Sequence, residues 1–278
     1  MSLIKDLKPY KDEWRLTVKL LHAWKQSTSY GGDTHESKRY LPLGEWKVID
    51  TFKIGQAGGQ YRPTKQKYKM TILGDTVITP SEFQNDSHFL DLASYEEIGN
   101  GKCKPNFLID IMGQVTDLGA VANVQAKGID TKRVNFFMRD ISGNEIACCL
   151  WGIYAEQFEK HIESDAGEIE ICLIRFAKIG NYKGEVQITN AFDATIVVLN
   201  PTMEEAIDFK EKMMNNPLPL ALCDQSDEKK IMTKSVEVPL IDHNKESSSE
   251  DVSTPFSKSK EGDADLKDMN STSKTEED

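Results

Sequence analysis

The sequence predicts an all-β protein with short helices, and residues 132–151 carry the clearest signal. Apolar side chains recur at every second position in 134–138 and again in 146–150, and Ser142-Gly143-Asn144 lies between the two runs. A period of two indicates strands with one buried face, and the Ser-Gly-Asn segment indicates a turn. Strands of this kind recur along the first 200 residues, with one helical pattern after the hairpin.

The two faces of this predicted hairpin differ in chemistry. The face expected to be buried carries Val134, Phe136, Met138, Ile146, Cys148 and Leu150. The opposite face carries Arg133, Asn135, Phe137, Arg139, Ala147, Cys149 and Trp151. A sheet surface that mixes arginine with Phe and Trp fits one on which unpaired bases stack while cations meet phosphates.

The first unit, up to residue 104, contains shorter strand patterns. The patterning predicts strands in 13–24, 44–54 and 67–78, loops at 25–37 and 57–63, and a partly helical stretch in 80–98 that includes 89–93. Only three strand regions are present, so an incomplete domain is expected.

The second unit, 105–201, is predicted to be complete. In order it has a strand at 107–118, a loop at 119–131, the hairpin, a helix at 154–162, a strand at 168–179, a turn at 181–184 and a strand at 185–199. Three strands, a helix and two strands in about this length fit the five-stranded Greek-key barrel called the OB-fold, with the helix closing its base. Residues 202–214 are predicted to form a short helix, and the chain from about Leu218 is predicted to be disordered because it is poor in apolar residues.

Charge is distributed unevenly along the chain. Of the net −11, residues 202–278 carry −9, residues 1–104 carry +3 and residues 105–201 carry −5. Most of the acidity therefore lies in a tail, but the −5 of the complete domain argues against tight phosphate binding. The tail has two interpretations: it serves solubility, or it mimics nucleic acid and competes for the basic groove, with phosphorylation of Ser247–Ser249 adding charge.

Enzymatic and metal chemistry find no support in the sequence. The five cysteines show no CxxC spacing, the five histidines are scattered, and Asp110 and Asp140 stand without a metal motif, nucleophile elbow or phosphate loop. We therefore expect no enzyme, cofactor, metal site or disulfide framework. No signal peptide or 18-residue apolar run is visible, and a reducing compartment is expected.

Residues 107–201 resemble the middle DNA-binding barrels of the replication protein A large subunit. The matching motifs are Arg139-Asp140, Ser142-Gly143, Leu150-Trp151-Gly152, Ala155 with Phe158, Tyr182-x-Gly184 and Asn200-Pro201. Residues 1–201 resemble a plant branch of that family still more closely, through Leu7-Lys8-Pro9, Tyr61-Arg62-Pro63-Thr64, Tyr68-Lys69-Met70 and Ile174-Arg175-Phe176-Ala177-Lys178. The resemblance implies that Trp151 and Tyr182 stack on bases.

Two departures from the family limit what carries over. The segment that supplies strands two and three of the first barrel is missing between residues 32 and 40, so we do not transfer DNA binding to 1–104. A zinc-containing third barrel is absent, so assembly of a heterotrimer is not expected from this chain.

Each candidate residue has a structural alternative. Trp151 could be a core residue at the barrel end, Tyr182 a turn aromatic that covers an apolar edge, and Phe137 a side chain packed under the first strand, which is the favoured interpretation for Phe137. The candidate phosphate contacts are Lys132, Arg133, Arg139, Arg175, Lys178 and Lys183. Arg139 and Lys183 are preferred because they are expected to adjoin the two stacking aromatics.

The sequence therefore predicts three parts: a truncated OB-like domain at 1–104, a complete OB-fold at 105–201 and an acidic tail at 202–278. The predicted function is single-stranded DNA binding in replication, recombination or repair, in the nucleus, with little sequence preference and with other replication or repair proteins as further partners. The residues do not discriminate DNA from RNA, and no membrane association is expected. The alternatives are a protein-interaction barrel that has lost nucleic-acid binding and a decayed or truncated copy that folds poorly.

Overall fold

The computed structural model describes residues 4–9, 14–24, 41–59, 61–126, 128–164 and 167–215. The predicted disordered tail from Leu218, the serine cluster at 247–249 and the predicted loop at 25–37 lie outside these residues. Within them, no helix is long and apolar enough to cross a membrane.

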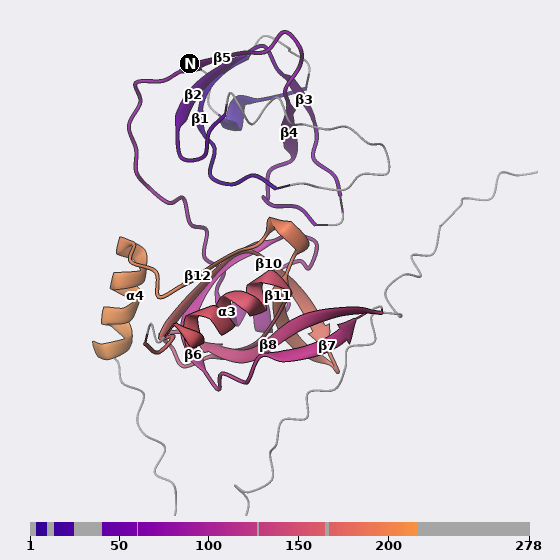
Figure 1. Cartoon of the computed structure of the whole chain (residues 1–278). Coiled ribbons are helices and arrows are strands. Elements are labelled where there is room, and N and C mark those ends of the chain that lie inside the picture. The colour runs from indigo at the N-terminus through magenta and orange to yellow at the C-terminus, as the bar shows by residue number, and fades with distance from the viewer. Residues whose placement is uncertain are drawn as a thin grey trace, which may run out of the picture. The chain divides into compact units, whose positions relative to one another are not determined.

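The second unit is built from one curled sheet (Figure 1). Its elements are β6 (Ile109–Thr116), β7 (Ala122–Ala126), β8 (Ile129–Arg139), β9 (Glu145–Trp151), α3 (Ile153–Glu163), β10 (Ile171–Tyr182), β11 (Glu185–Asn190), η2 (Phe192–Ala194) and β12 (Ile196–Leu199). β6 pairs with β8, β8 with β9, β9 with β11 in parallel, β11 with β10, and β10 back with β6. This circuit of pairings is the OB-fold order that the sequence predicts.

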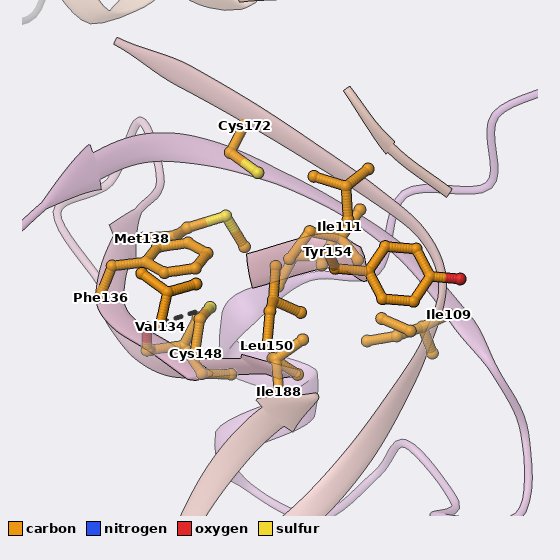
Figure 2. Packing of buried hydrophobic residues seen from close by; sticks show 14 of the residues in the cluster. Ile109, Ile111, Val134, Phe136, Met138, Cys148, Leu150, Tyr154, Cys172 and Ile188 are labelled. Atoms are coloured by element: carbon orange, nitrogen blue, oxygen red, sulfur yellow. Dashed lines mark hydrogen bonds between the residues drawn. The ribbon is translucent and has the colours of Figure 1, made fainter. Parts of the chain in front are cut away.

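The interior of this circuit is the face that strand alternation predicts (Figure 2). All six hairpin side chains predicted to point inward are at most 6% exposed, and Ala155 and Phe158 of α3 are fully buried with them. Gly113 on β6 is required by close approach, because a Cβ there would lie 2.1 Å from the hydroxyl oxygen of Tyr95. That hydroxyl donates a hydrogen bond to the Met112 carbonyl.

Three predicted elements of the sequence are corrected. The loop expected at 119–131 contains β7, which pairs with the start of β8 as a hairpin. The single strand expected at 185–199 is two strands separated by η2, because Thr195 bonds the Ala191 amide and the Phe176 carbonyl and turns the chain there. The helix expected around 89–93 is wrong: Leu92 forms a β-bridge with Asp110, and the helix is α2 (Tyr95–Gly99), capped by Ser94.

The first unit has two small sheets. A three-stranded sheet has the order β1 (Arg15–Lys19), β2 (Trp46–Asp50) and β5 (Val77–Pro80), and β3 (Lys53–Gln56) pairs separately with β4 (Tyr68–Thr71). A short helix, η1 (Ile4–Asp6), precedes them. The core of these elements includes Leu16, Ile49, Phe52 and Ile54. The three strands predicted for this unit are corrected to five, because the predicted strand at 44–54 spans β2 and the start of β3, and the one at 67–78 spans β4 and the start of β5.

The last described helix, α4 (Glu204–Asn215), packs on the outside of the curled sheet. Its Ala206 is buried in a cluster with Met112, Ile171 and Leu173, whose side chains point outward from β6 and β10. α4 therefore covers the outer surface of β6 and β10. The cluster that it forms there includes no residue of the β8–β9 hairpin.

Candidate nucleic-acid interface

The outward face of the β8–β9 hairpin is set by its antiparallel register. Arg133 lies opposite Trp151, and Phe137 lies opposite Ala147. Asn135 and Arg139 occupy the intervening positions, opposite Cys149 and Glu145. Residues paired in this way project from the same side of the sheet, so two arginines and two aromatics share one face, as alternation predicts.

The same face continues onto β11 and β10. Thr189 of β11 lies level with Cys149 of β9, and Glu185 lies opposite Tyr182 of β10. Trp151, two residues beyond Cys149, is therefore level with residue 191, six positions along β11 from Glu185. At about 3.3 Å per residue, Trp151 and Tyr182 mark opposite ends of the face, about 20 Å apart along the strand direction.

This geometry corrects the predicted neighbours of the aromatics. Arg139 does not adjoin Trp151, because it lies opposite Glu145 at the Tyr182 end of the face. The cation beside Trp151 is Arg133, whose guanidinium carbon is 5.6 Å from the centre of the indole ring. The sequence did not show which residue of β8 lies opposite Trp151. The antiparallel pairing places Arg133 there, at the end of β9.

The arginine row contains polar groups without partners. Arg133 is only 8% exposed, yet its Nε and Nη1 make no hydrogen bond. The next two outward residues repeat this pattern, with Asn135 Oδ1 and Arg139 Nε buried and unbonded, although Arg139 Nη2 donates to Gln114 Oε1 at 2.6 Å. Among the described residues, four of the eight such side-chain atoms come from these three neighbours. Buried polar groups normally have partners, so this concentration is unusual.

The side chain that lies beneath the ring of Trp151 is buried rather than exposed. Cys149, expected on the open face, is 1% exposed. Burial raises the pKa of its thiol to about 11, while Arg133 and a hydrogen bond from the side chain of Trp151 act in the opposite direction. The indole therefore reaches over Cys149 and stays partly exposed, and its backbone amide donates to Asn190 Oδ1 at 2.9 Å.

Phe137 and the Tyr182 turn complete the face. Phe137 is 37% exposed, so the favoured interpretation that it packs beneath the first strand is wrong. Lys183 and Gly184 both have positive φ, at 53° and 94°, as a tight two-residue hairpin turn requires. The ammonium of Lys183 lies 5.7 Å from the centre of the Tyr182 ring.

Three predicted phosphate contacts are engaged elsewhere. Lys132 pairs with Glu159 of α3, which raises the pKa of the lysine. Arg175 pairs with Asp110 at 3.0 Å and donates to the carbonyls of His88 and Phe89. Lys178 points outward on β10, with its ammonium 5.0 Å from the centre of the Tyr61 ring. These partners are distant in sequence, and the patterns of single strands carry no signal for them.

Sequence reasoning did not single out Gln114 and Asn190, which hold Arg139 and Trp151 in place. Both carry amides at strand positions that pair with the interface strands, a signal visible only once the register is known. In the part of the chain that the structure describes, no group of three or more His, Cys, Asp or Glu side chains could hold a metal ion.

Comparison with known proteins finds similarity to replication protein A. A family model described as the replication protein A OB domain matches residues 101–199, and a domain of unknown function, DUF223, matches residues 33–101. The replication protein A 70 kDa DNA-binding subunit of Danio rerio is 24% identical over 233 residues. The chain is a replication protein A large-subunit-like OB-fold protein. A plant relative, a replication protein A 70 kDa DNA-binding subunit of Oryza sativa subsp. japonica, is also 24% identical, over 175 residues.

The chain spans only part of the length of these curated relatives. The zebrafish alignment covers 73% of this chain and 37% of the relative, and the rice alignment covers 59% and 18%. A solved structure of a replication protein A heterotrimer bound to single-stranded DNA matches 77% of this chain and 55% of its own, with 16% identity and a TM-score of 0.49.

Proposed function

We propose that this chain binds single-stranded DNA without catalysis, through the outward face of β8, β9, β10 and β11. Bases stack on Trp151, Phe137 and Tyr182, and phosphates contact Arg133, Arg139 and Lys183. The observation that carries the proposal is the row of buried polar atoms without hydrogen-bond partners along β8, on Arg133, Asn135 and Arg139. A buried polar group without a hydrogen bond costs the free protein about 1–3 kcal/mol. A ligand that forms hydrogen bonds with these atoms removes that cost, and this favours binding.

The spacing of the aromatics suits an extended strand. Trp151 and Tyr182 lie at the two ends of the face, with the exposed ring of Phe137 on β8 between them in register. OB-folds accommodate about 4–16 nucleotides, and stacking tolerates every base because each has a π-face. Little sequence preference is therefore expected.

The local charge of the face differs from that of the domain. Its outward positions and turn carry four cations, Arg133, Arg139, Lys178 and Lys183, against two carboxylates, Glu145 and Glu185. Much of the opposing acidity belongs to α3 and to the segment before β10. With about three phosphate contacts, log K should fall with log salt with a slope of about −2.

The cellular role follows from the relatives. They are named DNA-binding subunits of replication protein A, which supports action in replication, recombination or repair, in the nucleus and beside other proteins of those processes. Membership of a plant branch and the boundaries 1–104, 105–201 and 202–278 are parts of the same proposal.

A protein-interaction module that has lost nucleic-acid binding is the second candidate. It is favoured by the net −5 of residues 105–201 and by the engagement of Lys132, Arg175 and Lys178 with other side chains. This candidate predicts no binding to DNA even at low salt.

Fluorescence anisotropy separates the two. A labelled single strand of about 30 nucleotides, longer than one OB-fold footprint, is titrated with wild type, Trp151→Ala and Tyr182→Ala across a salt series. Ile162→Ala, an exposed apolar residue on α3, is the matched control. Each aromatic variant should lose about 1–3 kcal/mol, or roughly 5- to 150-fold in affinity, and the control nothing. Salt-sensitive binding that ignores both aromatic changes would contradict stacking.

A further inference from the structure

Asn135, on the outward face of β8, carries a buried hydrogen-bond acceptor that has no partner. Its side-chain oxygen, Oδ1, is one of the four buried and unbonded atoms in the row along β8. The other three are N–H donors of Arg133 and Arg139, so in this row of described residues Asn135 supplies the only acceptor. A phosphate, which suits the arginines, cannot satisfy this oxygen because both groups are acceptors.

The neighbouring groups of the protein do not supply the missing donor. Cys149 lies directly opposite Asn135, and burial raises the pKa of its thiol to about 11. Cys149 therefore remains a neutral thiol, which is a weak donor, and its sulfur accepts from the side chain of Trp151. Arg133 and Arg139 keep unbonded N–H groups, yet neither donates to Asn135. The donor must therefore come from a ligand.

Asn135 lies between two ring positions of the interface. Arg133, two residues before it, lies opposite Trp151, and Phe137 is two residues after it. Two residues of a strand span about 7 Å, so Asn135 is one repeat of the strand from each ring position. In the proposed complex, bases held along these rings present their edges to the position that Asn135 occupies.

Single-stranded DNA offers hydrogen-bond donors only on its bases. The phosphate and sugar oxygens within the strand are acceptors, and these suit the arginines. Every base carries an N–H group: thymine at N3, cytosine at N4, adenine at N6, and guanine at N1 and N2. The oxygen of Asn135 is therefore matched by a base edge and by no atom of the DNA backbone.

We propose that Asn135 accepts a hydrogen bond from the N–H edge of a base held between Trp151 and Phe137, and that it thereby selects unpaired bases. The inference rests on the proposed function and adds a specificity-determining residue to it. All four bases offer a donor, so the contact agrees with little sequence preference. In thymine the only N–H is the one that a Watson–Crick pair uses, so a paired thymine has no donor left for Asn135.

A double-mutant cycle between protein and ligand tests this contact. Anisotropy is measured with a labelled oligothymidylate of about 8 nucleotides, within the footprint of one OB-fold, and with the same strand built from N3-methylthymine, which has no base N–H. The full chain is assayed as wild type, Asn135→Leu, Asn135→Ala and Trp151→Ala. Asn123→Leu is the matched control, because Asn123 is exposed and lies opposite Lys132, on the other face of the sheet.

Methylation of the strand should weaken binding to wild type by about 3- to 10-fold, as expected for the loss of one neutral hydrogen bond. Asn135→Leu and Asn135→Ala should weaken binding of the unmodified strand by a similar factor and show no further loss on methylation. Asn123→Leu should behave as wild type does. In urea denaturation, Asn135→Leu should be at least as stable as wild type, because it removes a buried acceptor that has no partner.

Each contrary result is distinct. If methylation weakens binding to wild type and to both Asn135 variants equally, or if these variants bind the unmodified strand as well as wild type does, Asn135 does not contact a base and the inference fails while the stacking face stands. Wild-type binding that ignores methylation overturns it without any protein variant. If Trp151→Ala binds the unmodified strand as well as wild type does, the proposed function itself fails, whatever Asn135 does.

Discussion

Replacing Arg133 with methionine should change stability and binding in opposite directions. Methionine keeps a long flexible side chain but removes the charge and its donors. In the free protein, the guanidinium is almost fully buried, with Nε and Nη1 unbonded. Removing the guanidinium should therefore stabilise the free protein, because no buried donor is left without a partner. It should weaken the complex, because a contact with the ligand is lost.

The magnitudes follow from the contacts of this side chain. Unsatisfied buried donors cost about 1–3 kcal/mol, and the cation–π contact with Trp151 offsets about 0.5–2 kcal/mol of this. Arg133→Met should thus raise the free energy of unfolding by roughly 1 kcal/mol. Loss of a charge-assisted hydrogen bond to the ligand costs about 1.5–3 kcal/mol, so affinity should fall by about 10- to 150-fold.

Urea denaturation and anisotropy titrations on the same samples measure both quantities. Arg175→Met is the matched control, since Arg175 is also an outer-strand arginine but is paired with the buried carboxylate of Asp110 and with two carbonyls. Breaking a buried pair typically costs about 3–5 kcal/mol. The control should therefore lose stability and, while folded, keep its affinity.

The reasoning is refuted if Arg133→Met destabilises the protein by more than about 1 kcal/mol and leaves DNA affinity unchanged. That outcome would make Arg133 a structural residue whose partners form within the protein. A loss of both stability and affinity in Arg175→Met, measured on folded protein, would return Arg175 to the interface.

Three further predictions test the fold and the charge assignment. Gly113→Ala places a Cβ 2.1 Å from the Tyr95 hydroxyl and should cost about 1–3 kcal/mol in a thermal melt, whereas Gly180→Ala, with its nearest atom 3.5 Å away, should cost little. Lys132→Gln loses only its solvent-screened ion pair with α3, so the melting temperature should hardly change and the salt slope should stay unchanged. Lys183→Gln should reduce the salt slope by about 0.7, and an unchanged slope would remove Lys183 from the phosphate contacts.

The core was predictable because its signal is local. Alternation in 134–138 and 146–150 fixes which side chains point inward, and burial of both sets follows from the pleat. The helix at 154–162 was predictable for the same reason, since the helical spacing of its apolar residues alone places Phe158 in the core. By contrast, the break at η2 depends on Thr195 bonding across to β10, and the bridge at Leu92 depends on Asp110, so neither could be read from its own segment.

The sequence predicted which face of the sheet carries the candidate residues, but not which of these residues are neighbours. Parity alone put Arg133, Phe137 and Trp151 on one side of the sheet. Which cation meets which ring depends on the register between strands, and this moved the partner of Trp151 from Arg139 to Arg133. Which cations remain for a ligand depends on ion pairs with distant carboxylates, such as Arg175 with Asp110, which no pattern within a strand encodes.

The energetics of the face explain why the cations beside the rings matter. Three stacked bases supply about 3–9 kcal/mol, while a micromolar complex needs about 8 kcal/mol after the cost of ordering a flexible strand has been met. Stacking on Trp151, Phe137 and Tyr182 alone would therefore give weak binding. In the proposed complex, charge-assisted bonds to Arg133 and Arg139 supply the remainder, so affinity should depend strongly on salt although the domain as a whole is acidic. An acidic barrel can bind a polyanion in this way because charges on exposed surfaces are screened beyond about 8 Å at physiological salt, and the strand responds to the face that it touches.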